Sequence, residues 1–200
     1  IPRLQLTSLK SIDLSECGLN ADAGSMLAEL LQALPGLRTL SLARNYRLEN
    51  AGVQAFANRL RDESHGHSLA ELDLSCCSLA GEEGKVAVLA ILQHLPELDT
   101  LAVSSNPGLG PYVAPLLEHV LCNTQISALS FASCGISANL RLDLASCRGP
   151  HLTSLDMSGN TGIGPLGLHS FTSQLPKMNL QRLNLADCGL ESRAGGDSIA

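Results

Sequence analysis

Three glycines near the end of the chain have the spacing of a dinucleotide-binding fingerprint. Gly162, Gly164 and Gly167 read G-x-G-x-x-G, follow an apolar run that begins at Leu152, and precede a possible helix. Asp187 lies twenty positions after Gly167, where such a site carries the acidic residue that binds the ribose. Two alternatives follow: a loop that cradles phosphates, or a turn of another origin with the same spacing.

Other arrangements with catalytic potential are few. The chain has no G-x-S-x-G, G-x-x-x-x-G-K-[ST], H-E-x-x-H or C-x-x-C motif, and His94, His119 and His169 fall in predicted helices. Because nothing places a nucleophile beside a base, we predict that the protein is not an enzyme.

The polar run RDESHGHS, residues 61–68, has side chains that could hold a metal, namely Asp62, Glu63, His65 and His67. A short polar run with two histidines is more typical of a solvated loop. We therefore predict neither a metal nor a cofactor.

The amino-acid composition limits which kinds of partner and which cellular compartments are expected. Of the 200 residues, 44% are hydrophobic and only 2% aromatic, which predicts an aliphatic core, and the net charge of −6 argues against nucleic acid as the main partner. No apolar stretch approaches the roughly 20 residues of a membrane span, and no signal peptide is recognisable. We expect an intracellular protein, cytoplasmic or nuclear, with no membrane contact.

Leucines reveal the elements that must position these residues. Seven segments of the sequence, which we call lines, follow the pattern L-x-x-L-x-L-x-x-(N or C). They begin 28, 32, 29, 28, 26 and 28 residues apart, at Leu9, Leu37, Leu69, Leu98, Ile126, Leu152 and Leu180. The L-x-L alternation predicts a strand with one buried face. Helical periodicity between the lines predicts helical crossovers, and Pro35, Pro96 and Pro176 are expected to end three of them.

The ninth position of each line alternates strictly between two residue types: Cys17, Asn45, Cys77, Asn106, Cys134, Asn160 and Cys188. We call this set the ladder. A buried Asn there would hydrogen-bond backbone groups at the corner after the strand, and Cys fits the same slot as a small, weakly donating residue. All seven ladder residues are predicted to be buried.

This alternation of two repeat types, each about 28 to 29 residues long, resembles the ribonuclease-inhibitor-like leucine-rich repeats. The resemblance implies an α/β solenoid, a curved right-handed β-α superhelix with parallel strands on the concave face and helices on the convex face. It covers residues 1–200 as one domain of about seven repeats, and we expect a fragment of a longer chain because neither end carries a polar cap. Proteins with similar repeats include nucleotide-binding innate-immune receptors, Ran GTPase-activating proteins and Tonsoku-like scaffolds.

Geometry predicts the state of the four ladder cysteines. Ladder cysteines lie two strands apart, roughly 9 to 10 Å, whereas a disulfide needs Cα atoms within about 7 Å. They are therefore expected to be buried, reduced thiols. Cys76 precedes Cys77 at an expected exposed strand position; it is the most plausible reactive thiol, although an inert surface cysteine is the favoured interpretation.

Two lines depart from the others. The 32-residue line carries the RDESHGHS loop, and the 26-residue line has Arg141 where other lines have a glycine, so its helix is expected to be short or distorted, leaving a notch on the convex side.

Outward strand positions form the candidate site. One column is entirely Ser or Ala (Ser15, Ala43, Ser75, Ser104, Ala132, Ser158 and Ala186), a floor that a partner backbone could approach closely. Charged residues flank it, and the candidate partner-binding set is Asp13, Glu16, Arg44, Glu71, Asp73, Asp99, Asp156, Arg182 and Asp187. The alternative is that small residues merely fit a tightly curved inner face.

The repeat register also decides the opening question. Asn160 is a ladder residue, Ile163 is the inward anchor after it, and Gly162 and Gly164 recur as Gly108 and Gly110 two repeats earlier. We therefore predict a turn rather than a dinucleotide site. The favoured function is a protein-interaction module that receives a helix or extended segment of basic character; the alternative is a GTPase-activating or regulatory repeat domain.

Overall fold

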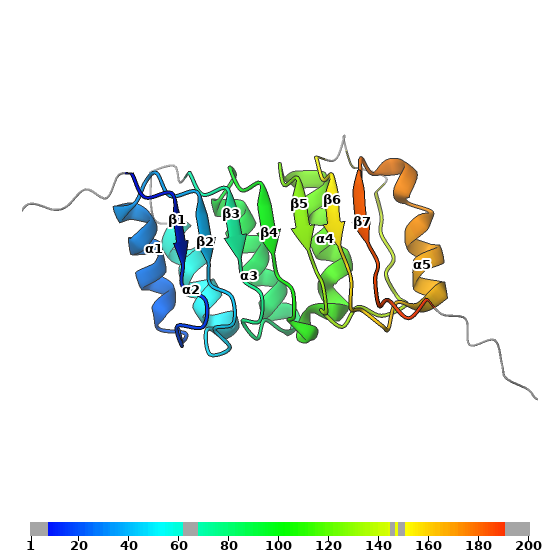
Figure 1. The fold of residues 1–200 in the computed structure, drawn as a ribbon, viewed down its shortest axis with the longest axis horizontal. Coiled ribbons are helices and arrows are strands. Elements are labelled where there is room, and N and C mark those ends of the chain that lie inside the picture. Colours follow the sequence, from blue (N-terminus) through cyan, green and yellow to red (C-terminus); the bar gives the residue numbers. More distant parts are fainter. Residues whose placement is uncertain (1–7, 62–67, 145–146, 148–150, 191–200) are drawn as a thin grey trace, which may run out of the picture.

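A sheet of seven parallel strands, backed by helices, forms the protein in the computed structural model, which describes residues 8–61, 68–144, 147 and 151–190 (Figure 1). The strands lie side by side in chain order: β1 (Ser11–Asp13), β2 (Thr39–Ser41), β3 (Glu71–Asp73), β4 (Thr100–Ala102), β5 (Ala128–Ser130), β6 (Ser154–Asp156) and β7 (Arg182–Asn184). This arrangement confirms the predicted α/β leucine-rich-repeat solenoid.

Helices lie on one side of the sheet and connect the strands, except between β5 and β6, where the described residues contain none (Figure 1). They are α1 (Ala23–Ala33), α2 (Glu49–Arg61), α3 (Gly81–His94), α4 (Val113–Asn123) and α5 (Gly164–Thr172), with the short 3-10 helices η1 (Pro107–Tyr112) and η2 (Leu175–Lys177). α1 and α3 end just before Pro35 and Pro96, as expected of a residue that cannot continue a helix. Pro176 instead lies inside η2.

The strands pair in register, so that equivalent leucines stack. Leu40 lies beside Leu72, Leu72 beside Leu101, and Leu129 beside Leu155. These side chains point toward the helices and are at most 3% exposed. Because side chains alternate across a strand, the residues on either side of each leucine form the opposite face of the sheet. We call that opposite face the concave face.

The core between the two layers is mainly aliphatic and contains three buried phenylalanines, Phe56, Phe131 and Phe171. Each helix contributes one stripe to it. In α1 the stripe is Leu27, Ala28 and Leu31, spaced three and four residues apart.

The connection between β5 and β6 has no helix in its described residues, 131–144, 147 and 151–153. The expectation of a short or distorted helix was therefore wrong for this part of the chain. Leu140, Leu142 and Leu144 alternate with polar residues, a period that favours extended chain, and Leu140 and Leu144 are buried. We call residues 139–144 the coil segment.

Three sequence predictions lie outside the described residues. They concern the two chain ends, within residues 1–7 and 191–200, and the four side chains of the RDESHGHS loop, within 62–67.

Candidate functional site

The concave face carries one column of residues at the third position of each strand: Asp13, Ser41, Asp73, Ala102, Ser130, Asp156 and Asn184. Their acidic members also end the strands. In β3, Oδ1 of Asp73 accepts the backbone N–H of Ser75 at 2.8 Å, and in β6, Oδ1 of Asp156 accepts the N–H of Ser158 at 2.8 Å. Such Asx turns mimic a backbone turn and bend the chain out of the strand.

The same turn recurs at both ends of the sheet. Asp13 accepts the N–H of Ser15 at 2.9 Å, and the amide oxygen of Asn184 accepts that of Ala186 at 3.1 Å. The hydroxyl and the backbone N–H of Ser15 lower the pKa of Asp13. These carboxylates thus have a structural use that their sequence pattern did not reveal.

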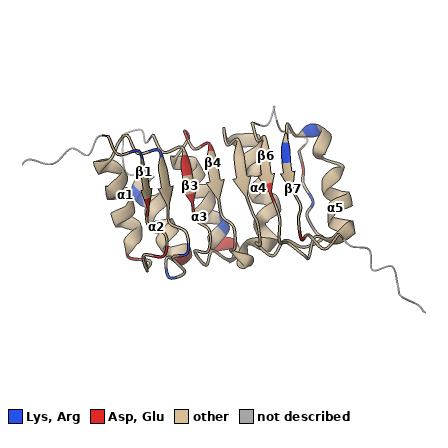
Figure 2. Ribbon diagram, viewed as in Figure 1, with Lys and Arg blue, Asp and Glu red and all other residues tan. Residues whose placement is uncertain are grey.

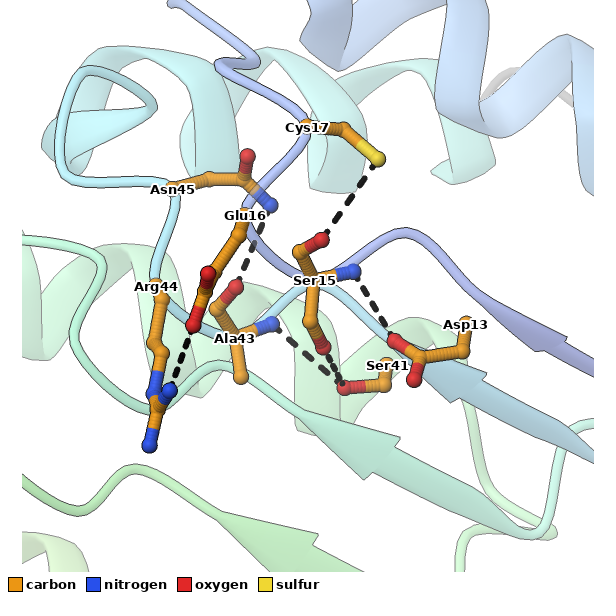
Figure 3. Close-up of polar contacts among 8 residues, drawn as sticks. All are labelled: Asp13, Ser15, Glu16, Cys17, Ser41, Ala43, Arg44 and Asn45. Atoms are coloured by element: carbon orange, nitrogen blue, oxygen red, sulfur yellow. Dashed lines mark hydrogen bonds and ion pairs between the residues drawn. The ribbon is translucent and has the colours of Figure 1, made fainter.

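The Ser/Ala floor is half-buried over most of its length, and two of its serines bond to serines of the neighbouring strand column. The hydroxyls of Ser15 and Ser41 lie 2.7 Å apart across neighbouring strands, and those of Ser104 and Ser130 lie at the same distance (Figure 3 for the first pair). Small side chains that satisfy one another can fit a closely curved sheet without a ligand. Their presence is therefore compatible with both alternatives raised by the sequence.

The next column lies beyond the strands, in the turns. Glu16, Arg44, Cys76, Ser105, Ser133, Gly159 and Asp187 all have φ between 53° and 70°. Cys76 is therefore a half-buried turn residue, which corrects the expectation of an exposed strand position. Its backbone N–H still donates to the carbonyl of Ser104 at 2.9 Å, so the hydrogen bonding between neighbouring strands continues into the left-handed turn.

Glu16 and Arg44 of this turn column form an ion pair across β1 and β2 (Figure 3). Both side chains are 61% exposed, so the pair adds little to stability. Beside it, Glu16, Gly18, Arg44, Tyr46 and Arg47 line a surface cavity of about 450 Å³, and Tyr46 is 60% exposed.

Three other acidic candidates, Glu71, Asp73 and Asp99, lie on β3 and just before β4 (Figure 2). Glu71 and Asp99 are exposed, and their nearest bonded groups are hydroxyls: Thr39 donates to Glu71 and Thr100 to Asp99, each at 3.4 Å. Arg38, also exposed, offers its backbone carbonyl to Glu71. Arg182 and Asp187 are exposed too, but they lie at the far end, on and after β7.

The asparagine members of the ladder behave as predicted. Asn45, Asn106 and Asn160 are at most 1% exposed. The Nδ2 group of Asn106 donates to the carbonyls of Val103 and Leu74 at 2.8 and 3.0 Å, and its Oδ1 accepts the N–H groups of Cys77 and Leu79 at 3.0 Å. Each asparagine therefore joins its own turn to the preceding repeat.

Three ladder cysteines are also buried, as predicted. Cys77, Cys134 and Cys188 are free thiols, and each Sγ donates to a carbonyl of an earlier repeat: to Leu42 at 3.3 Å, Val103 at 3.2 Å and Met157 at 3.1 Å. Cys17 is exposed, so that part of the prediction was wrong. The described residues place no earlier repeat beside β1, and Cys17 bonds only the Ser15 carbonyl of its own turn, at 3.5 Å.

Burial of these thiols predicts a loss of stability in alkali. Desolvation raises the pKa of Cys77 to about 12 and that of Cys134 to about 11, from 9.0. The thiols ionise first in the unfolded chain, so their contribution to stability is complete below pH 9. It falls between pH 9 and those values, by up to about 1.4 kcal/mol per thiol and pH unit. The free energy of unfolding, measured by urea denaturation at pH 8 and at pH 10, gives this loss of stability. The Cys77→Ala, Cys134→Ala double variant should lose less stability over the same interval; an equal loss in both proteins would contradict the assignment.

The three glycines of the fingerprint are explained by packing between repeats, at Gly162 and Gly167, and by a positive φ, at Gly164. Gly162 lies in the turn after Asn160, and a Cβ there would stand 2.8 Å from the carbonyl oxygen of Ile136. Gly164 begins α5 with a φ of 57°. Gly167 lies within α5, where a Cβ would approach the Cα of Ala138 to 2.9 Å. Ile163 is buried, as its register predicted.

Sequence reasoning missed one pair of cysteines. Cys122, in α4, and Cys147, after the coil segment, form a disulfide with Cα atoms 4.5 Å apart. Their position outside the ladder was the available signal. Within residues 8–61, 68–144, 147 and 151–190, no three His, Cys, Asp or Glu side chains gather closely enough to hold a metal ion.

Comparison with known proteins places these repeats in a family. A family profile described as Leucine Rich repeat matches residues 5–28 and 150–171. The chain is 32% identical to mouse NACHT, LRR and PYD domains-containing protein 14, with 94% of this chain and 19% of the relative aligned. It is 28% identical to mouse Tonsoku-like protein (96% and 14%) and 26% identical to mouse ribonuclease inhibitor (94% and 41%).

The chain thus spans less than a fifth of the first two relatives and under half of the third. None of the helices in the described part of the chain combines the length and hydropathy that a bilayer crossing requires. The shared repeats support a protein-interaction or regulatory role. Alternating Asn and Cys ladders, in-register parallel strands and these relatives together show that the chain belongs to the ribonuclease-inhibitor-like leucine-rich-repeat family.

Proposed function

We propose that this chain is a protein-interaction module, a recognition or scaffolding arm of a larger intracellular protein. Its concave face would receive a helix or an extended segment of a partner. The names of the NACHT, LRR and PYD domains-containing relatives put leucine-rich repeats beside other domains, which supports an arm of a multidomain protein.

The observation that carries the proposal is the acidic region at β3 and β4. The exposed carboxylates of Glu71 and Asp99 are bonded only to threonine hydroxyls in the described residues, and Asp73 lies on the same strand as Glu71. Complementary charge steers association and orients a partner. A segment with lysine or arginine at the matching position would therefore be preferred.

The proposed site differs from a tight hydrophobic interface. Binding energy in such interfaces is concentrated in Trp, Tyr and Arg, and the strands of this face contain no Trp or Tyr. The exposed Tyr46 and Arg47 at the rim supply those residue types. We propose that the face sets orientation and charge preference, and that the rim adds contact area.

Charge reversal at the acidic region should remove partner capture. In affinity capture from cytosolic and nuclear extracts, quantified by mass spectrometry, the Glu71→Lys, Asp99→Lys variant is expected to recover the partner at least about tenfold less than the unmodified chain. The control, Glu29→Lys, Glu83→Lys, makes the same change in charge on the exposed sides of α1 and α3 and should recover it normally. Equal recovery by both variants would refute binding at the concave face.

Asp73 needs a gentler substitution because its carboxylate also caps a turn. Asp73→Asn removes the charge and keeps an oxygen that can accept the N–H of Ser75, as Asn184 does for Ala186. Weaker partner capture by this variant would therefore result from the lost charge and not from a disrupted turn.

A further inference from the structure

The disulfide between Cys122 and Cys147 joins two repeats at the connection between β5 and β6, whose described residues form no helix. Cys122 belongs to the last turn of α4, and Cys147 follows the coil segment 25 residues later. The bond therefore attaches an irregular connection to the helix beside it.

Within the described residues, the coil segment forms neither helix nor strand, and other contacts also hold it. The backbone N–H of Asp143 donates to the Glu118 carboxylate of α4, and Leu140 and Leu144 are buried in the core. Segments held by few buried contacts open with lower free energy than packed helices and strands. Breaking the disulfide should therefore open the coil segment before it opens the packed helices and strands.

The pair is also accessible in a way that the ladder thiols are not. Cys122 and Cys147 are half-buried, whereas Cys77, Cys134 and Cys188 are at most 1% exposed and donate to carbonyls. Thiol–disulfide exchange requires that an attacking thiolate reach a sulfur. Cys17 and Cys76 can be reached from solvent, but both are free thiols.

We propose that Cys122 and Cys147 form a reversible thiol–disulfide site that exchanges with the glutathione couple, and that its reduction releases the coil segment from α4. This inference is independent of the proposed partner binding. It rests on the location of the pair at a helix-free connection, on its accessibility, and on the inaccessibility of the buried ladder thiols.

The exchange is balanced by two glutathione molecules. The thiolate of the first attacks one sulfur of the pair, forming a mixed disulfide and expelling the other cysteine as a thiolate, which takes a proton from water. The second glutathione thiolate attacks the glutathione sulfur of that mixed disulfide and expels the remaining cysteine, which is protonated in turn. Two protein thiols and one glutathione disulfide result, and oxidation is the reverse.

The test equilibrates the folded chain in buffers with increasing ratios of reduced to oxidised glutathione, followed by acid quenching, alkylation and peptide mass mapping. Two thiols, mapped to Cys122 and Cys147, should appear together while circular dichroism stays unchanged. Trypsin cleavage after the exposed Arg141 should become at least about tenfold faster in the reduced protein.

Serine variants separate the pair from the other cysteines. Cys122→Ser and Cys147→Ser should each cleave at the fast rate in oxidising buffer, and Cys17→Ser should behave like the unmodified chain. The proposal is overturned if the pair resists reduction until the chain unfolds, if another pair titrates, or if reduction leaves cleavage after Arg141 unchanged. Because the reduced unmodified chain gives the same readout, a variant that fails to fold does not remove the test.

Discussion

Replacing Asn106 with alanine is expected to lower the free energy of unfolding by about 4 kcal/mol. The amide makes good hydrogen bonds to four buried backbone groups, two carbonyls and two N–H groups, and alanine can replace none of them. Each buried group left without a partner costs about 1–3 kcal/mol, partly relieved by relaxation. Urea unfolding followed by circular dichroism measures the loss.

Cys134→Ala is the matched control, since it empties the ladder position of the next repeat. Its thiol makes one weak bond, to the carbonyl of Val103 at 3.2 Å. We expect a loss of about 1 kcal/mol, from one hydrogen bond and a small cavity. Similar losses for both variants would show that the ladder stabilises the fold through volume rather than through hydrogen bonds.

Gly135→Ala is expected to cost about 3 kcal/mol, through two separate effects. Gly135 has a φ of 75°, where an L-residue is strained by roughly 1–2 kcal/mol. A Cβ there would also stand 2.7 Å from the carbonyl oxygen of Pro107 in the preceding repeat. That oxygen belongs to the backbone, so relief requires the two repeats to move apart.

Gly18→Ala separates the two effects. Gly18 follows Cys17 as Gly135 follows Cys134, and its φ is 68°, but a Cβ at this position would meet no neighbouring atom within 4 Å. Only the strain remains, so the expected loss is about 1 kcal/mol. Thermal and urea unfolding of both variants give the difference, and a loss at Gly18 as large as at Gly135 would refute the steric contribution.

The fold could be predicted from the sequence because its determinants are periodic. The inward leucines and the ladder asparagines recur at fixed positions in the repeats, and the leucines of α1 recur with helical spacing. Each recurrence indicates the same local environment. Cys17 shows where this reasoning stops. Its letters match those of Cys134 and Cys188, but its burial depends on whether another repeat lies beside it, and a pattern within one line cannot report that.

The roles of the candidate site residues could be predicted less well from the sequence. Asp73 and Asp156 were selected for their charge, yet each also accepts a backbone N–H and shapes a turn, because a carboxylate two residues before a serine can serve either purpose. The left-handed turn column carries seven residues of which only Gly159 suggests a positive φ. The Cys122–Cys147 bond depends on a connection whose path follows from no repeated pattern.

The extended coil segment between β5 and β6, where the described residues contain no helix, also affects the radius of the arc. Neighbouring strands are about 4.8 Å apart, whereas packed helices need about 8–10 Å, and this mismatch between layers bends a solenoid. An extended segment takes up less width than a helix, so the mismatch is smaller between β5 and β6 than between β2 and β3. The arc is therefore expected to straighten toward β6, which would let a rigid, straight ligand touch more consecutive strands there than at the acidic region of β3 and β4.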